Sequence, residues 1–119
     1  MSNEQKLLTM KVTHFFLGTL RMKNTSIGYC YWIDAVIYYI KKYEKEEYIY
    51  CFEIDEIYTY LSYKYDKDFK NIEKLMRYAR EGSQYKEYFK TNRLTNSQFF
   101  IRCIDEFMPD KLEKLLFHE

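Results

Sequence analysis

Glycine and proline are scarce in this chain, with three glycines and one proline among 119 residues. Tight turns and hairpins depend on these two residues, so a fold built from many short strands would lack the turns that it needs. Aromatic residues make up 20% of the chain, which supplies apolar surface for a packed core and argues against disorder. We therefore expect one domain, residues 1–119, of long helices with short connections.

Apolar residues recur at helical spacing in most of the chain. We predict helices at 6–23, 27–45, 53–65, 66–81 and 96–107, a short helical turn within 83–94, and a short amphipathic helix at 110–117. In 27–45 we expect Tyr29, Ile33, Val36 and Ile40 to face inward, and we expect the indole N–H of Trp32 to need a partner if it is buried. Residues 46–52 alternate as a strand does, but a lone short strand has nothing evident to pair with, so we expect an extended link or a helix start.

The segment 66–81 has the clearest two-sided pattern. Phe69, Ile72, Met76 and Ala79 are spaced by three or four residues and share one face, whereas Lys70, Asn71, Lys74 and Arg77 fall on the opposite side. Asp68 stands where an N-cap belongs, and Gly82 follows the last turn, where we expect a left-handed residue. Thr95 and Gln98 form a capping box that opens the helix at 96–107.

A short connection joins the helix at 53–65 to the basic helix that follows it. Two helices with a tight turn, the second carrying a basic face, are typical of a helix-turn-helix that binds DNA. The alternative is a charged face that is only solvated. The formal net charge of +1 is low for a DNA-binding protein, but residues 64–103 form a basic block between acidic segments at 41–56 and 104–119.

Motifs for catalysis or for metal and cofactor binding are absent from the sequence, so we expect neither an enzyme nor a cofactor. Cys30, Cys51 and Cys103 have no disulfide or zinc spacing and are expected to be buried, reduced thiols. We expect His14 to be a core or boundary residue. No signal peptide or membrane-spanning segment is evident, so we expect a cytoplasmic protein without membrane contact. The many tyrosines could stack on single-stranded nucleic acid, but at helical spacing they are more typical of a core.

Three segments taken together resemble one family. GYCYWIDAV at 28–36, NIEKLMRYA at 71–79 and TNSQFFIRCIDEF at 95–107 are similar, in this order, to segments of the DNA-binding effector domain of the sporulation master regulator, stage zero sporulation protein A. The resemblance covers residues 12–107. It implies an all-α domain of about six helices that binds duplex DNA sequence-specifically, with the helix at about 68–81 in the major groove. It also implies binding as head-to-tail pairs, as a homodimer on tandem sites, and contact with RNA polymerase.

The chain departs from that family in three ways. The N-terminus leaves no room for the family's phosphoacceptor receiver domain, so we expect a stand-alone regulator. Asn71 and Lys74 stand where the family has arginines, which favours adenine at one position and removes a bidentate guanine contact at the other, while Glu73 and Arg77 match. The loop after the helix is shorter than the family's polymerase-contacting loop, so a repressor or competitor is an alternative to an activator.

These arguments divide the candidate residues into two sets. The expected base-contacting set is Lys70, Asn71, Glu73, Lys74 and Arg77. The expected phosphate-contacting set is Lys67, Lys86, Lys90, Arg93, Thr95, Asn96 and Ser97. A rival hypothesis is a protein-interaction module that modulates a full-length regulator or RNA polymerase without binding DNA itself.

Overall fold

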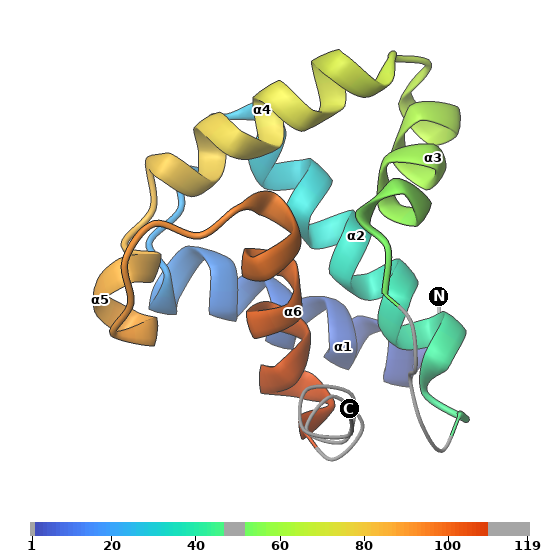
Figure 1. Cartoon of the computed structure of the whole chain (residues 1–119). Coiled ribbons are helices and arrows are strands. Elements are labelled where there is room, and N and C mark those ends of the chain that lie inside the picture. Colours follow the sequence, from blue (N-terminus) through green and yellow to red (C-terminus); the bar gives the residue numbers. More distant parts are fainter. Residues whose placement is uncertain (1, 47–51, 110–119) are drawn as a thin grey trace.

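The protein is helical throughout the part of the chain that the structure, a computed structural model, describes, namely residues 2–46 and 52–109 (Figure 1). This confirms the all-α class with about six helices. The elements within these ranges are α1 (Asn3–His14), a π-helical turn η1 (Phe15–Thr19), α2 (Ile27–Tyr43), α3 (Ile54–Tyr65), α4 (Phe69–Glu81), α5 (Tyr85–Phe89) and α6 (Asn96–Phe107).

Helix α2 is the element around which the others pack. It crosses the middle of the molecule and contacts α1, α3, α4 and α6 (Figure 1). Of the residues predicted to face inward, Val36 and Ile40 are buried, whereas Tyr29 and Ile33 are only half-buried. The buried face also includes Tyr31, Trp32 and Tyr39. Tyrosine and tryptophan bury a large apolar area when their one polar atom has a hydrogen-bond partner, and a prediction from the spacing of the apolar residues gives them too little weight.

Helix α1 begins earlier than predicted and ends in a widened turn. Ser2 caps it in a capping box with Gln5, so the helix starts at Asn3 rather than at residue 6. In η1 the N–H of Leu20 donates to the carbonyl of Phe15 at 2.9 Å, five residues back, and this extra residue in the turn lets both Phe15 and Phe16 be buried. Arg21 then adopts a left-handed conformation with φ 53°, which ends the helix before residue 23.

Two predictions of burial, for His14 in α1 and for Cys30 in α2, are wrong. His14 is exposed, because it lies on the side of α1 opposite to the buried Val12 and Phe16, and its ring covers Gly18 instead of entering the core. Cys30 is also exposed, since the face that α2 buries passes through Tyr31 and Trp32 rather than through Cys30. Cys103 is buried as expected, and Cys51 lies outside the described residues.

The helix ends in the second half of the chain follow their capping residues. Asp68 accepts a hydrogen bond from the N–H of Asn71, and Thr95 caps α6 in a capping box with Gln98, both as predicted. The prediction of a left-handed Gly82 is wrong, because Gly82 has a right-handed conformation with φ −82°. Ser83 donates both its N–H and its hydroxyl to the Arg80 carbonyl, so a left-handed residue is not needed there. The short helical turn predicted within 83–94 is α5. The segments predicted at 46–52 and 110–117 fall largely or wholly outside the described residues.

Candidate nucleic-acid interface

Helices α3 and α4 form the predicted pair of helices joined by a short turn. The turn spans residues 66–68, with Asp66 in the left-handed conformation that ends α3 (φ 54°) and Asp68 as the cap of α4. The Ser62 hydroxyl donates to the Lys67 carbonyl and the Lys67 N–H donates to the Ser62 carbonyl, so hydrogen bonds close the turn from both sides. Rings of Tyr58 and Phe69 meet edge to face across the two helices. This connection sets the direction in which α4 leaves α3.

Helix α4 is held against α2 through its backbone. A Cβ atom on Gly28 would lie 2.1 Å from the carbonyl oxygen of Leu75, so only glycine permits the observed approach of the two helices. One turn further along α2, the buried indole N–H of Trp32 donates to the carbonyl of Met76 at 2.8 Å. Ile72 and Met76 are fully buried at the same contact. The inner side of α4 is therefore fixed.

A buried polar cluster also supports α4, from below its C-terminal half. Arg80 is 2% exposed, and its Nε donates to Oδ1 of Asn96 at 3.0 Å. The Asn96 amide nitrogen donates to the hydroxyl of Tyr58 at 3.1 Å and to the carbonyl of Glu73 at 3.2 Å. The Tyr85 hydroxyl accepts from Arg80 Nη1 at 3.3 Å and from the N–H of Leu94. Residues from four helices thus share their hydrogen bonds, and burial raises the pKa of the Tyr58 hydroxyl.

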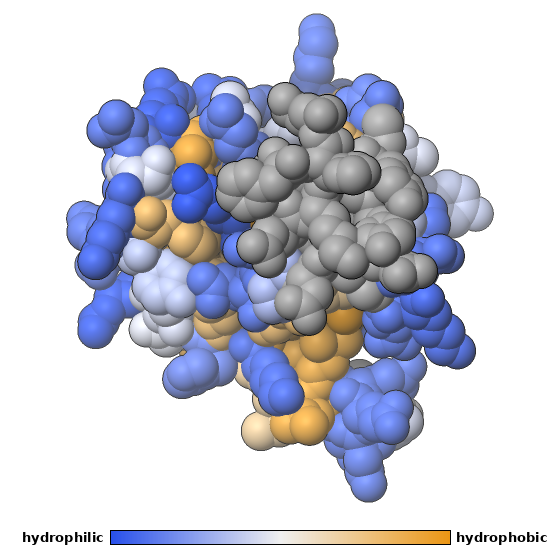
Figure 2. Space-filling model, turned by 60° about the horizontal axis from the view of Figure 1, so that its bottom comes forward, coloured by the Kyte–Doolittle hydropathy of each residue, from blue (hydrophilic) through white to orange (hydrophobic). Residues whose placement is uncertain are grey.

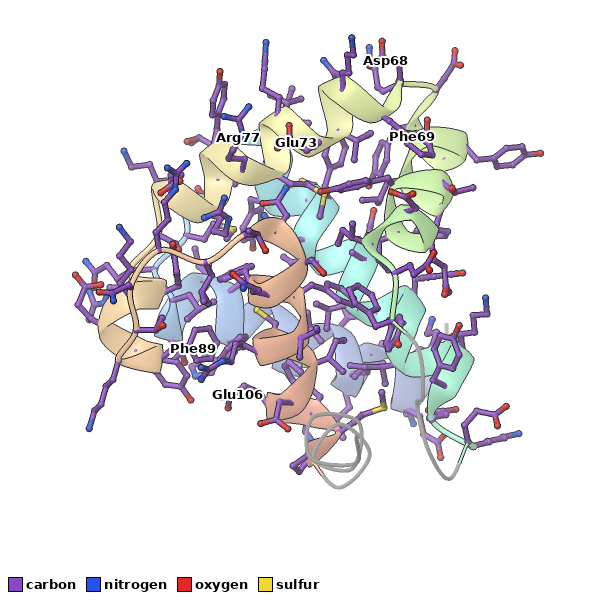
Figure 3. The ribbon with its side chains drawn as sticks, viewed as in Figure 1. Asp68, Phe69, Glu73, Arg77, Phe89 and Glu106 are labelled. Carbon is purple, nitrogen blue, oxygen red and sulfur yellow. The ribbon has the colours of Figure 1, made fainter. Side chains whose placement is uncertain are left out.

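The opposite side of α4 carries the predicted row of charged residues. Lys70 and Lys74 are exposed, and Arg77 and Glu73 are half-buried and point away from the core (Figure 3). Arg77 Nε lies 3.0 Å from Oε1 of Glu73 in an ion pair one turn apart. The exposed ring of Tyr78 lies beneath the cations of Lys74 and Arg77, at 5.9 and 5.4 Å. Lysine, arginine and an aromatic ring are thus presented together on one outer surface.

Asn71 differs from the other members of the predicted base-contacting set. It is half-buried, and its Oδ1 atom is shielded from solvent with no hydrogen-bond partner among the described residues. In this conformation the oxygen is closed to a base edge. The backbone N–H of Asn71 is occupied by Asp68. The Asn71 side chain would have to rotate outward to take part in a contact.

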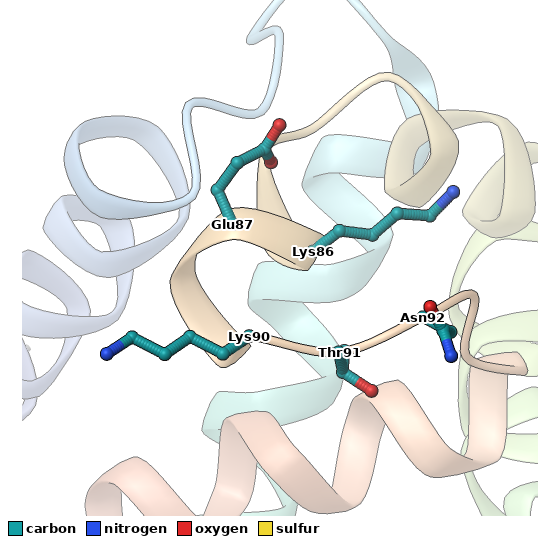
Figure 4. Close-up of a pocket in the computed structure, with 5 residues that line it drawn as sticks. All are labelled: Lys86, Glu87, Lys90, Thr91 and Asn92. Carbon is teal, nitrogen blue, oxygen red and sulfur yellow. The ribbon is translucent and has the colours of Figure 1, made fainter.

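The predicted phosphate-contacting set is divided among four places. Lys67 is exposed in the turn before α4, and Thr95 and Ser97 lie at the start of α6, which abuts α4 at Glu73. Arg93 is 65% exposed and pairs with Glu81 at the end of α4 (2.7 Å). Lys86 and Lys90 belong to α5 and its end, where they line a shallow hollow with Glu87, Thr91 and Asn92 and extend in opposite directions (Figure 4).

The prediction that Asn96 contacts phosphate is wrong. Its side chain is 6% exposed, and both its oxygen and its nitrogen are engaged inside the buried polar cluster, so it is closed to phosphate. Its position in the polar run TNSQ suggested surface exposure, but α6 begins against α4, and the residue after the cap faces inward. Arg80 belongs to the same cluster and was not predicted, because a basic residue in a basic block carries no local sign of burial.

Other kinds of site have no support in the described part of the chain. No group of three or more histidine, cysteine or acidic side chains that could hold a metal ion occurs there. None of the described helices is long and apolar enough to cross a membrane. Compared with protein-family models, with curated proteins and with solved structures, the chain gives no match.

Proposed function

We propose that this chain is a transcriptional regulator that binds duplex DNA sequence-specifically, with α4 in the major groove. The supporting observation is the outer surface of α4, where Lys70, Lys74 and Arg77 follow one another at helical spacing while the opposite side is fixed to α2. An α-helix fits the major groove, and lysine and arginine bind guanine there. A helix that cannot shift on its support can hold a fixed register on the bases.

The other members of the two sets have roles that follow from their positions. Lys67, Thr95 and Ser97 border α4 and would bind phosphates beside the groove. Glu73 would accept from a cytosine amine once Arg77 leaves it for a base or phosphate. Lys86, Lys90 and Arg93 lie beyond the C-terminal end of α4 and would reach only a neighbouring stretch of backbone.

The resemblance to the sporulation regulator's effector domain extends this proposal. On that basis the chain is a cytoplasmic regulator of a bacterium that binds tandem DNA sites as head-to-tail pairs and acts near RNA polymerase. Because Asn71 and Lys74 differ from the family's arginines, the chain would recognise a DNA sequence different from that of the family.

Selection of binding sites from random duplex oligonucleotides by the purified protein tests the proposal. We expect a short motif to be enriched at physiological salt, and we expect the enrichment to disappear in the Lys74→Ala and Arg77→Ala variants. Lys41→Ala is the matched control, because Lys41 is an exposed lysine on α2 in the acidic part of the chain. A folded protein that enriches no motif would refute the proposal.

A second candidate function, a module that binds another protein through α4, draws on the aromatic residues of this helix. Tyr78 is 56% exposed and Phe69 is 43% exposed, and aromatic residues are enriched at protein interfaces. The Glu73–Arg77 pair also leaves less free positive charge than the row suggests. This candidate predicts that RNA polymerase or a full-length regulator is retained by the protein, and that Tyr78→Ala abolishes the retention while duplex DNA does not compete.

A further inference from the structure

Helix α1 exposes apolar side chains on the side that faces away from α2. Leu7 is 52% exposed and Met10 is 67% exposed, which places them among the most exposed large apolar residues of the described chain. On the opposite side of the same helix Val12 is fully buried. Seen from below, the molecule displays an apolar strip bordered by hydrophilic side chains (Figure 2). The buried side fixes the rotation of α1, so Leu7 and Met10 cannot turn inward.

The exposed residues have the spacing of a seam between two paired helices. Asn3, Leu7, Met10 and His14 follow each other at intervals of four, three and four residues, and all four are exposed. Such a narrow stripe is the pattern of a coiled-coil contact rather than of a helix covered on a broad face. We call these four residues the α1 seam. Its two apolar members lie at the centre and its two polar members at the ends.

The seam is complementary to itself when two copies of α1 run antiparallel. Centring the pair between Leu7 and Met10 puts Leu7 of one chain against Met10 of the other, in both directions. The same register puts Asn3 against His14, so the apolar centre has a polar rim, as protein interfaces commonly have. An isologous contact of this kind repeats every residue pair across a two-fold axis.

The charges beside the seam select this arrangement. Glu4 and Lys11 lie seven residues apart on one flank, both are exposed, and neither has an ion-pair partner among the described residues. In the antiparallel register the same flanks meet, and Glu4 of each chain faces Lys11 of the other. A parallel pair would instead bring Lys6 of one flank against Lys11 of the opposite flank, which like charges oppose.

We propose that the α1 seam is a homodimer contact in which two copies of this chain pair antiparallel through α1. The contact has only two apolar residues from each chain, and small interfaces are typical of weak association, so the dimer forms and dissociates with protein concentration. This pairing does not depend on the proposed DNA-binding function, since α1 and α4 lie on different sides of the molecule (Figure 1).

Exchange of the two charges tests the proposal by sedimentation over a wide range of protein concentrations. Wild-type protein is expected to dimerise. Glu4→Lys puts two lysines at each contact, Lys11→Glu puts two glutamates there, and each is expected to weaken dimerisation about tenfold. The double variant restores opposite charges and dimerisation. An equimolar mixture of the two single variants is expected to form a heterodimer, since each of its contacts joins a lysine to a glutamate.

Leu7→Ser and Met10→Ser remove the apolar centre and are expected to abolish dimerisation, whereas Lys41→Glu, a charge reversal on α2, leaves it unchanged. Circular dichroism confirms that each variant is folded. A wild-type protein that stays monomeric, or single variants that the mixture does not rescue, would overturn the proposal. Binding to vesicles containing phosphatidylserine that is lost in Leu7→Ser, without self-association, would assign the seam to a membrane surface instead.

Discussion

Asn96 illustrates how one side chain determines whether the helices behind α4 fit together. Its carboxamide accepts from Arg80 and donates to Tyr58 and to the Glu73 carbonyl, so it links α3, α4 and α6 in a region closed to solvent. Removing it takes one hydrogen-bond partner from each of three polar groups, and one of these is the buried guanidinium of Arg80, which keeps its contact with Tyr85. A buried polar group that loses its hydrogen-bond partner destabilises the fold by more than a typical hydrogen bond contributes to the free energy of unfolding.

Asn96→Ala is accordingly expected to lower the free energy of unfolding by about 1–3 kcal/mol. Asn92→Ala, which changes an exposed asparagine in the loop before α6, is expected to have almost no effect. Urea unfolding followed by circular dichroism measures both. Equal stability of the two variants would mean that the buried cluster does not support the fold.

The two described cysteines are expected to differ in reactivity. Cys103 is fully buried, and burial, together with the nearby Glu106 carboxylate, raises the pKa of its thiol well above the ordinary value of 9.0. The thiolate is the reactive form, so Cys103 should resist iodoacetamide in the folded protein while exposed Cys30 is alkylated. Peptide mass spectrometry before and after addition of denaturant locates the label. Modification of Cys103 at the rate of Cys30 in native protein would contradict its burial.

Among the elements, the contact between α2 and α4 depends most on a single residue. Gly28→Ala would drive a Cβ atom into the Leu75 carbonyl and the Ala79 side chain, both within 2.8 Å. Because one of these neighbours is backbone, the helices must separate, and we expect a loss of about 1–3 kcal/mol in the free energy of unfolding.

Gly82→Ala is the matched control for this substitution. The nearest atom to a Cβ there is 3.5 Å away and the residue is right-handed, so alanine is expected to stabilise the protein by about 0.4–1 kcal/mol. Thermal unfolding compares the two variants. A tolerated alanine at position 28 would show that α2 and α4 do not approach as closely as described.

Helices α2 and α3 are joined by a carboxylate whose charge depends on pH. Burial would raise the pKa of Glu56, but hydrogen bonds from Lys42, Tyr43 and Tyr38 outweigh it and hold the pKa below the ordinary value of 4.5. A carboxyl whose pKa is lowered by folding stabilises the protein above its unfolded pKa and loses that contribution as the pH falls through its folded pKa.

The stability difference between wild type and Glu56→Gln should therefore be constant above the ordinary pKa and shrink as the solution is acidified below it. Urea unfolding at a series of pH values measures the difference. A difference that grows on acidification would have the wrong sign and would exclude a charged, hydrogen-bonded Glu56.

Local capping signals predicted several helix boundaries, and Ser2 with Gln5 shows that a further one was present in the sequence. The buried faces were harder to predict. The pattern of 66–81 correctly placed Ile72, Met76 and Ala79 on the inner side of α4, but Phe69, which it also placed there, is 43% exposed. The apolar pattern of α2 was less informative, because tyrosines occur on every side of this helix and its contacts with the other helices decide which of them are buried. Arg80 and Asn96 are polar residues buried by tertiary contacts, so local spacing could not reveal them.

Across the described part of the molecule, the charged side chains differ in whether an opposite charge already pairs with them. The exposed lysines of α4 stand apart from the α2–α3 contact, where Lys42 and Lys64 are already paired with Glu56 and Asp34. A low net charge can therefore coexist with a basic surface at α4. Electrostatic binding depends on the local surface as well as on the total charge.

Under the proposed function, Lys74→Ala and Arg77→Ala should each weaken specific DNA binding by about 1–3 kcal/mol, provided that they contact bases. Fluorescence anisotropy with the selected duplex, at several salt concentrations, measures this loss. The wild-type affinity should fall with salt by roughly 0.9 log units per log unit of salt for each phosphate neutralised. Lys41→Ala should match wild type, and an affinity unchanged in both α4 variants would remove this helix from the interface.

The supports of α4 reach it at its main chain. Trp32 donates to the Met76 carbonyl, Asn96 donates to the Glu73 carbonyl, and Gly28 lies against the Leu75 carbonyl. None of these contacts depends on which side chains α4 turns outward. Outer residues of α4 can thus be replaced by mutation without moving the helix, so related chains could diverge in what they bind while inheriting the same scaffold. The same independence makes α4 a suitable helix in which to build a library of altered specificities.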